Sequence, residues 1–256
     1  MKPGRVGQYA YRLLVATASA ILLASCAVNS PHPYSTDFDL LTALPDRLGS
    51  IEDGRGRFRE ILCAVFERHG EDLADYRPCE EALARVGMEP PGTGEPIDFS
   101  SRGEGFLVGF VPGLGWDCVE EWLDVENFTS PRSLGYGFDA LMIDVDGLSG
   151  TRNNASQIAE YLAALPAEHA GKKLILIGYS KGASDILRFL VDYPGMAGNV
   201  VAVVSIAGAV GGSPLSYDAT QNQAELLKLT PQSECDEGDG KAVESLRPDR
   251  RLAWLE

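Results

Sequence analysis

Residues 178–182 read Gly-Tyr-Ser-Lys-Gly and match the pattern G-x-S-x-G. The apolar run before them predicts a strand, and the amphipathic run after them predicts a helix. A turn this sharp strains its central residue, and side chains in place of Gly178 and Gly182 would collide with their surroundings. Ser180 is therefore expected at the carboxyl end of the strand, where its hydroxyl oxygen can attack a carbonyl carbon and the helix N-terminus favours developing negative charge. The alternative is a serine in a structural tight turn.

The predicted strand, turn and helix resemble the nucleophile elbow of the α/β-hydrolase superfamily, which includes serine esterases and lipases. The resemblance covers the chain from about residue 100 to its end. It implies that Ser180 forms an acyl-enzyme with a small carboxylic ester or thioester. The substrate stays open, because lipids, polyesters, peptide esters and small acyl esters all fit this chemistry.

A glycine-rich loop adds to the resemblance. Pro112-Gly113-Leu114-Gly115-Trp116 follows the apolar run 105–111, where the superfamily usually has His-Gly-x-x-Gly. By position, the implied oxyanion hole consists of the backbone N–H groups of Leu114 and Lys181. Since only the backbone of Lys181 has this role, its side chain is expected to be solvated at the rim of the site. Pro112 departs from the family pattern, and an ordinary glycine-rich turn is the alternative.

Short apolar runs alternate with helical patterns between residues 100 and 206. The predicted strands are 105–111, 140–145, 174–177 and 200–206; the predicted helices begin near Asp117 or span 153–165 and 182–193. This alternation predicts an α/β fold with a mostly parallel sheet and helices on both faces. The resemblance also implies that the small loop 205–209, after the fourth strand, lies near the site.

Residues 51–95 predict a small helical segment that precedes the α/β region at 100–256. A first helix begins near residue 55 and ends at Gly70, and its apolar face is expected to hold Phe58, Ile61, Leu62, Val65 and Phe66. A second, short helix is predicted at 78–86, opened by Pro78.

Catalytic triads of the superfamily follow the chain order serine, acid, histidine, and no histidine follows Ser180. His169 precedes the strand that leads to the elbow, so it is expected at the opposite edge of the sheet. Asp218 is a candidate acid. Three side chains follow the second strand, Asp144, Asp146 and Ser149, and they either contact substrate or cap the next helix.

The strand 200–206 corresponds to the sixth of eight strands in the superfamily sheet, whereas 216–229 and 241–255 read as helical or cap-like. We therefore expect a C-terminally truncated hydrolase that is inactive as given. Two alternatives remain. One is a non-catalytic binding or scaffold protein with the same fold, and the other is a nonfunctional fragment with an open apolar edge at 200–206.

Residues 1–26 combine basic residues with a short apolar run and predict a secretory signal peptide. Their end, Leu23-Ala24-Ser25-Cys26, resembles the lipobox of bacterial lipoproteins, which implies lipidation of Cys26 and a membrane anchor. Ala27, rather than aspartate, favours the outer over the inner membrane. Residues 27–50, which include His32, predict a flexible tether. A plain signal peptide with a chance cysteine is the alternative.

Export places the other cysteines in an oxidising compartment, where four cysteines allow three pairings. We favour Cys63–Cys79, which flank one helix–loop segment, and Cys118–Cys235, which follow two adjacent strands. No spacing suggests a metal site, and no nucleotide or flavin motif suggests a cofactor.

The charge of the chain excludes one class of partner. Its 37 acidic residues outnumber 22 lysines and arginines and give a net charge of −15. Such a chain repels phosphate backbones, so nucleic acid is not an expected partner.

Overall fold

The computed structural model describes residues 52–70, 76–85, 87–100, 103–118, 137–224 and 238–255. The predicted signal peptide, Cys26, the tether and Cys235 lie outside these ranges. Two compact units divide the chain, Met1–Asp98 and Phe99–Glu256, and each is described by itself. Within the described ranges, no helix is both long enough and apolar enough to cross a membrane.

The N-terminal unit holds helices α3 (Arg55–His69) and α4 (Cys79–Ala82), which the disulfide Cys63–Cys79 joins. This disulfide confirms the first predicted pairing. The predicted second helix is too long, because the backbone becomes extended at Leu83.

The predicted apolar face of α3 is wrong in part: Phe58 and Ile61 are exposed, while Leu62, Val65 and Phe66 are half-buried. The buried side of α3 carries Arg59 instead, which forms an ion pair with Glu89 at 2.6 Å. The backbone of Pro90 and Pro91 packs against the same side at Gly56, where it leaves no room for a side chain.

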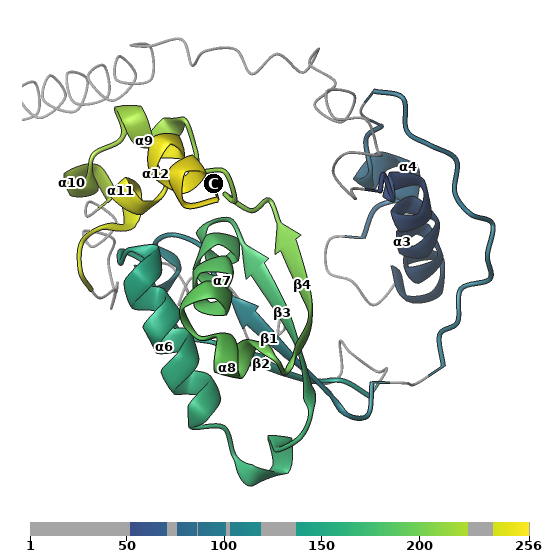
Figure 1. Ribbon diagram of the computed structural model, residues 1–256. Helices are drawn as coiled ribbons and strands as arrows, with labels where there is room; N and C mark the ends of the chain where they lie inside the picture. The colour runs from purple at the N-terminus through teal and green to yellow at the C-terminus, as the bar shows by residue number, and fades with distance from the viewer. Residues whose placement is uncertain are drawn as a thin grey trace, which may run out of the picture. The chain divides into compact units, whose positions relative to one another are not determined.

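The C-terminal unit contains a four-stranded parallel sheet with the order β2-β1-β3-β4. The strands are β1 (Phe106–Val111), β2 (Asp139–Met142), β3 (Lys173–Tyr179) and β4 (Val200–Ile206). Helices α6 (Thr151–Ala163) and α7 (Lys181–Asp192) pack side by side on one face of the sheet, and short α8 (Pro194–Ala197) follows α7 (Figure 1). This arrangement confirms the predicted α/β fold with a parallel sheet, whereas helices on the second face stay a prediction, since the described residues place α6 and α7 on one face.

The core lies between the sheet and these two helices. Its most buried side chains come from β1, β3, α6 and α7 and from the residues just after β2: Leu107, Val111, Ile143, Ile158, Leu176, Ile186 and Phe189. Nearly continuous apolar strands are typical of a parallel sheet, and they explain why the sequence predicted β1 and β3 well. A 3-10 helix, Trp116–Cys118, stands at the predicted start of the first helix; the rest of that prediction lies outside the described residues.

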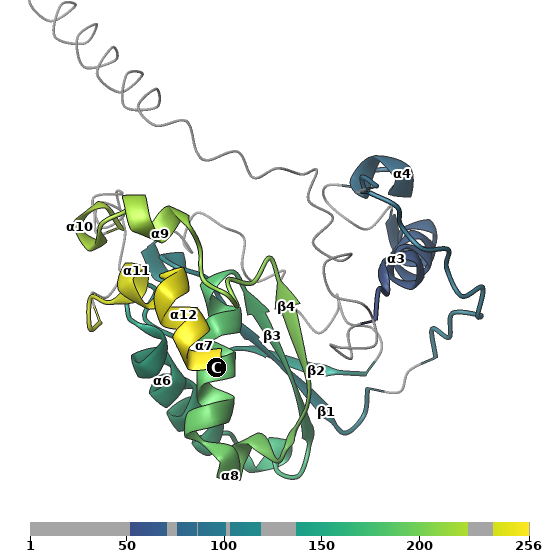
Figure 2. The same ribbon diagram turned by 45° about the horizontal axis from the view of Figure 1, so that its top comes forward.

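Among the described residues after β4 there are four short helices, and the last two of them lie beside α6 and α7 (Figure 2). They are α9 (Leu215–Asp218), α10 (Gln221–Ala224), α11 (Ala242–Ser245) and α12 (Pro248–Leu255). Hydrogen bonds connect this region to the loop before α6: Gly150 N–H donates to Asp239 at 2.7 Å, and Asp239 N–H donates to Ser149 Oγ at 2.8 Å.

Strand β4 lies at the edge of the sheet formed by the described residues. Successive side chains of β4 are exposed, so both of its faces are open; Val201 is 51% exposed and Val204 is 43% exposed. The open apolar edge expected at 200–206 is therefore present in this part of the chain.

Candidate active site

Ser180 occupies the turn between β3 and α7 with φ 51° and ψ −115°. Few residues other than glycine adopt a positive φ, and strain of this kind costs about 1–3 kcal/mol. The loop after β4 holds the turn, since Ser180 N–H donates to the Ile206 carbonyl at 2.9 Å and the Ser180 carbonyl accepts from Ala209 N–H at 3.0 Å. Within the described part of the chain, no hydrogen bond engages Ser180 Oγ. The predicted elbow is thus present, with its hydroxyl available.

The two glycines of the pattern are required by close packing. A Cβ atom at Gly178 would overlap the backbone of Ala183 in α7. One at Gly182 would overlap the carbonyl oxygens of Val111 and Pro112, at the end of β1. Because these obstacles are backbone atoms, they cannot rotate away, and the predicted reason for both glycines is correct.

The glycine-rich loop after β1 lies beside the serine. A Cβ atom built on Gly113 would be 3.1 Å from the Ser180 Cβ, which brings the backbone just before Leu114 close to the elbow. Lys181 is the first residue of α7, and its N–H has no carbonyl partner within the helix. Among described residues, no backbone hydrogen bond uses the N–H group of Leu114 or Lys181. Both groups remain able to bind an oxyanion.

The side chain of Lys181 contradicts our expectation of a solvated rim residue, because it is only 1% exposed. Its Nζ lies 2.9 and 2.8 Å from the two carboxylate oxygens of Asp185, one turn further along α7. Asn154 of α6 donates to the same carboxylate at 2.9 Å and to the carbonyl of Asp146 at 3.1 Å. A charged side chain is buried in a protein only when it is paired in this way. The i,i+4 spacing of lysine and aspartate was the available signal for this pair.

The buried carboxyl of Asp185 has a perturbed affinity for protons. Burial raises its pKa, because the charged form loses water, while Lys181 and Asn154 oppose the rise by stabilising the carboxylate. The charge of Arg251, in α12, also opposes it. The helix that follows the elbow therefore contains a buried carboxylate, Asp185, and the groups that interact with it come from α6, α7 and α12.

Two of the three candidate side chains after β2 have structural partners. Ser149 Oγ donates to Asp146 at 3.2 Å, and the side-chain amide of Asn153 donates to both residues at 3.0 Å. Asp146 and Ser149 thus organise the start of α6, which agrees with the expectation that these side chains cap the next helix. Asp144 is exposed. Asp218, the candidate acid, is an exposed residue at the end of α9.

His169 lies where the sequence predicted it, at the amino edge of the sheet. It ends a 3-10 helix before β3, and its Nδ1 is 3.5 Å from the carboxylate of Asp139, the first residue of β2. The full length of β3 separates His169 from Ser180, so His169 cannot act as the base. His69 belongs to α3 in the other unit, and His32 lies outside the described residues.

Cys118 is buried and disulfide-bonded. Cys235 lies outside the described residues, so the pairing Cys118–Cys235 stays a prediction. Within the described ranges, no group of three or more potential ligands could hold a metal ion.

No family model matches the chain, and no curated protein sequence matches it. Solved structures do match. The chain is similar to a carboxyl esterase from a metagenome, with 36% sequence identity and a TM-score of 0.71 over 83% of this chain. The chain is also similar to a lipase, BlEst2 from Bacillus licheniformis, with 25% sequence identity and a TM-score of 0.45. That match covers 63% of this chain and 62% of the lipase. A third match is the phospholipase PlaB from Legionella pneumophila in complex with thio-NAD, with 15% sequence identity and a TM-score of 0.39. It covers 59% of this chain and 33% of the phospholipase.

The parallel strand order, the strained serine elbow and the likeness to the esterase define the class of protein by its architecture: the chain has an α/β-hydrolase fold. Within that class, the chain is similar to a carboxyl esterase and spans 64% of that structure's length.

Gly182→Ala should lower the free energy of unfolding by about 1–3 kcal/mol, because the added methyl group meets the backbone oxygens at the end of β1. Urea denaturation measures the change. Gly195→Ala is the matched control, since nothing lies within 4 Å of its new Cβ atom, and it should leave stability unchanged or slightly increased. An equal loss in both variants would contradict the close packing at the elbow.

Lys181→Met should cost about 3–5 kcal/mol at neutral pH, because it leaves the charge of Asp185 buried without its cation. The variant also removes the charge that opposes the raised pKa of Asp185, so the folded variant takes up a proton more readily than the unfolded chain. The loss should therefore shrink as the pH falls.

Urea denaturation at neutral and mildly acidic pH tests both parts of this expectation for Lys181→Met. The double variant Lys181→Met/Asp185→Leu removes both charges and should recover most of the lost stability. A loss that is the same at both pH values would show that Asp185 stays charged or is not buried.

Proposed function

We propose that this chain is a carboxylic ester or thioester hydrolase in which Ser180 is the nucleophile. The observation that carries the proposal is the strained conformation of Ser180 at the carboxyl end of β3, with Oγ available and the loop of Gly113 beside it. The likeness to a carboxyl esterase supports the same reaction class.

The proposed reaction has two steps. Ser180 Oγ bonds to the carbonyl carbon of the ester and gives its proton to a base, while the N–H groups of Leu114 and Lys181 stabilise the negatively charged oxygen. The bond to the leaving alcohol or thiol then breaks, and that group takes up the proton. Water hydrolyses the acyl-enzyme and restores Ser180.

The base that accepts the proton of Ser180 is a histidine in the catalytic triads of this superfamily. No histidine follows Ser180 in this sequence. Loss of one triad member lowers the rate by orders of magnitude and leaves only catalysis by the oxyanion hole and by binding. We therefore expect the chain as given to hydrolyse esters slowly, and we expect a small external base to accelerate the reaction at Ser180.

Hydrolysis of p-nitrophenyl acetate, measured with and without added imidazole, tests this expectation. After subtraction of hydrolysis by imidazole alone, imidazole should raise the rate of the chain at least about tenfold, and Ser180→Ala should abolish the increase. Ser156→Ala on α6 is the matched control and should behave as the parent chain, because the Ser156 hydroxyl bonds only to the carbonyl of Asn153 among the described residues.

The same experiment separates a second candidate function, a binding or scaffold protein that keeps the fold without catalysis. The absence of a histidine after Ser180 is the observation that favours it. If Ser180→Ala has the same rate as the parent chain in imidazole, Ser180 is not a nucleophile and the binding function is preferred.

We also propose that the chain is exported and anchored to the bacterial envelope through a lipid on Cys26, with the outer membrane as its destination. The basic and apolar segments before Leu23-Ala24-Ser25-Cys26 support export and lipidation. Ala27 supports the outer membrane, since an aspartate at this position favours retention in the inner membrane.

Expression in a bacterial host with radiolabelled palmitate tests the anchor. The parent chain should incorporate label and sediment with membranes, and Cys26→Ser should do neither, because it removes the thiol that accepts the lipid. Ala27→Asp should keep the label and move the chain to the inner-membrane fraction. Label retained by Cys26→Ser would contradict lipidation at this residue.

A further inference from the structure

The glycine-rich loop 112–116 leads directly into a cysteine that is covalently bonded. Cys118 is the last residue of the 3-10 helix that follows the loop, and it is buried and disulfide-bonded. Its N–H donates to the carbonyl of Gly115 at 3.1 Å, so the cysteine and the end of the loop share one tight turn. A restraint on the sulfur of Cys118 therefore acts on the loop that offers the N–H of Leu114 to the proposed oxyanion hole.

The loop packs against the segment that follows β2. Gly115 N–H donates to the carbonyl of Gly147 at 3.1 Å. The carboxylate of Asp117 lies so close to Gly147 that a Cβ atom there would overlap it, and the same Cβ atom would be 2.8 Å from the backbone of Gly115. The residue next to Cys118 thus lies directly against Gly147.

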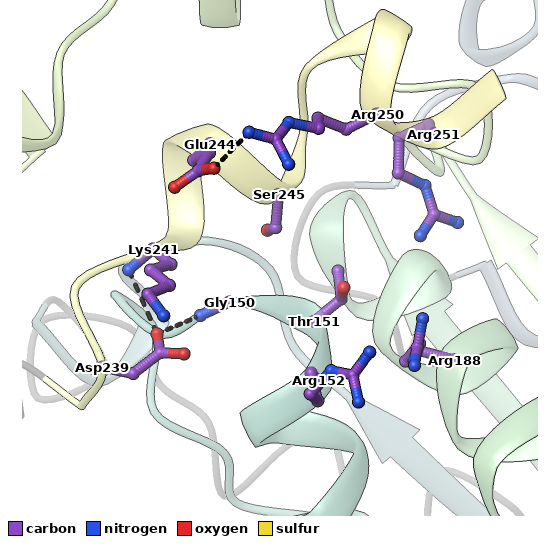
Figure 3. A pocket seen from close by; sticks show the side chains of 10 residues that line it. All are labelled: Gly150, Thr151, Arg152, Arg188, Asp239, Lys241, Glu244, Ser245, Arg250 and Arg251. Atoms are coloured by element: carbon purple, nitrogen blue, oxygen red, sulfur yellow. Dashed lines mark hydrogen bonds and ion pairs between the residues drawn. The ribbon is translucent and has the colours of Figure 1, made fainter. Parts of the chain in front are cut away.

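The chain before α11 packs on neighbouring residues of the same segment. Gly150 N–H donates to the carboxylate of Asp239 at 2.7 Å (Figure 3), and Asp239 N–H donates to Ser149 Oγ at 2.8 Å. A Cβ atom on Gly238 would overlap Ser149 Oγ and would be 2.7 Å from the carboxylate of Asp146. Residues 146–150 therefore contact both the end of the glycine-rich loop and the chain at Gly238.

The cysteine count leaves two possible partners for Cys118. The sequence has five cysteines, and the disulfide of the N-terminal unit uses two, so Cys26 and Cys235 remain. Cys26 belongs to the other compact unit, and the lipid proposed above would occupy its sulfur. Cys235 stands three residues before Gly238, and three residues span at most about 11 Å. Cys235 is therefore the partner that the chain keeps near the glycine-rich loop.

We propose that a disulfide between Cys118 and Cys235 positions the glycine-rich loop for catalysis. Oxyanion donors act only within about 2.7–3.1 Å of the charged oxygen, whereas a loop with two glycines has wide backbone freedom. The disulfide restrains the end of this loop, and hydrogen bonds hold the chain on the other side of the bond to residues 149 and 150. This inference rests on the proposed function, because it assigns the two cysteines a positioning role in ester hydrolysis.

Peptide mapping of the full chain without reduction tests the bond itself. Proteolysis should release one pair of peptides that holds Cys118 and Cys235 and that separates when it is reduced. A pair that holds Cys118 and Cys26, or a free Cys118 thiol, would overturn the proposal.

Cys235→Ala tests the role of the bond, because it opens the disulfide and keeps the buried side chain of Cys118. In the imidazole assay with p-nitrophenyl acetate, kcat should fall about tenfold with KM nearly unchanged, since a displaced Leu114 N–H stabilises the oxyanion poorly. Cys79→Ala is the matched control. It opens the disulfide of the other unit, and it should change neither constant.

Hydrogen exchange separates this inference from the proposed function. The amides of residues 113–118 should exchange at least about tenfold faster in Cys235→Ala than in the parent chain or in Cys79→Ala. Faster exchange in a parent chain without Ser180-dependent hydrolysis would contradict the esterase and support the restraint on the loop. Equal exchange in Cys235→Ala and the parent chain overturns the inference, whatever the activity.

Reduction of Cys79→Ala gives the same comparison without a substitution at residue 235. In this variant dithiothreitol passes two electrons and two protons to the disulfide of Cys118, which becomes two thiols, while the reagent closes its own disulfide. The amides of residues 113–118 should then exchange as fast as in Cys235→Ala. Unchanged exchange after reduction would contradict the proposal, even if Cys235→Ala fails to fold.

Discussion

The close approach of α7 to the end of β1 is the constraint on which the arrangement around Ser180 depends. At Gly182 the helix lies so near the carbonyl oxygens of Val111 and Pro112 that no side chain fits between them. Ser180 has a positive φ two residues before this contact, and the loop of Gly113, which continues from Pro112, lies beside the serine. The strained serine and the loop beside it therefore lie on either side of a single packing contact.

A strained turn persists only where its surroundings hold it, and here buried charge does so. Lys181 and Asp185 connect the first two turns of α7, and Asn154 extends the hydrogen bonds to α6 and to the carbonyl of Asp146. A buried ion pair contributes little net stability compared with apolar residues, but it is costly to break. Its consequence is geometric, since the start of α7 cannot move without exposing or separating the pair.

Sequence patterns predicted those elements of the site whose conformation depends on residues close by in the chain. The predictions were wrong where the conformation depends on residues that are distant in the chain. The elbow follows from glycines two residues on either side of Ser180, and β1 and β3 follow from uninterrupted apolar runs. Lys181 was misjudged because its backbone role in the turn says nothing about its side chain, although Asp185 stands at the spacing of a helical pair.

Distant packing also explains the errors in the N-terminal unit, and it groups basic residues that the sequence did not bring together. In α3 the apolar periodicity suggested one buried face, but the backbone of Pro90 and Pro91 covers the side of Gly56 instead. Arg152, Arg188 and Arg251 line one pocket, although they come from three helices that no spacing rule connects. Only the packing of α12 against α6 and α7 brings these charges together.

Asp185 connects the elbow to the C-terminal helices. Its carboxylate pairs with Lys181 directly, and it also interacts electrostatically with Arg251 of α12. The start of α7 is therefore tied by charge to a helix that lies far from it in the sequence. The interaction is effective because these groups are buried, where charges are screened much less than at the surface.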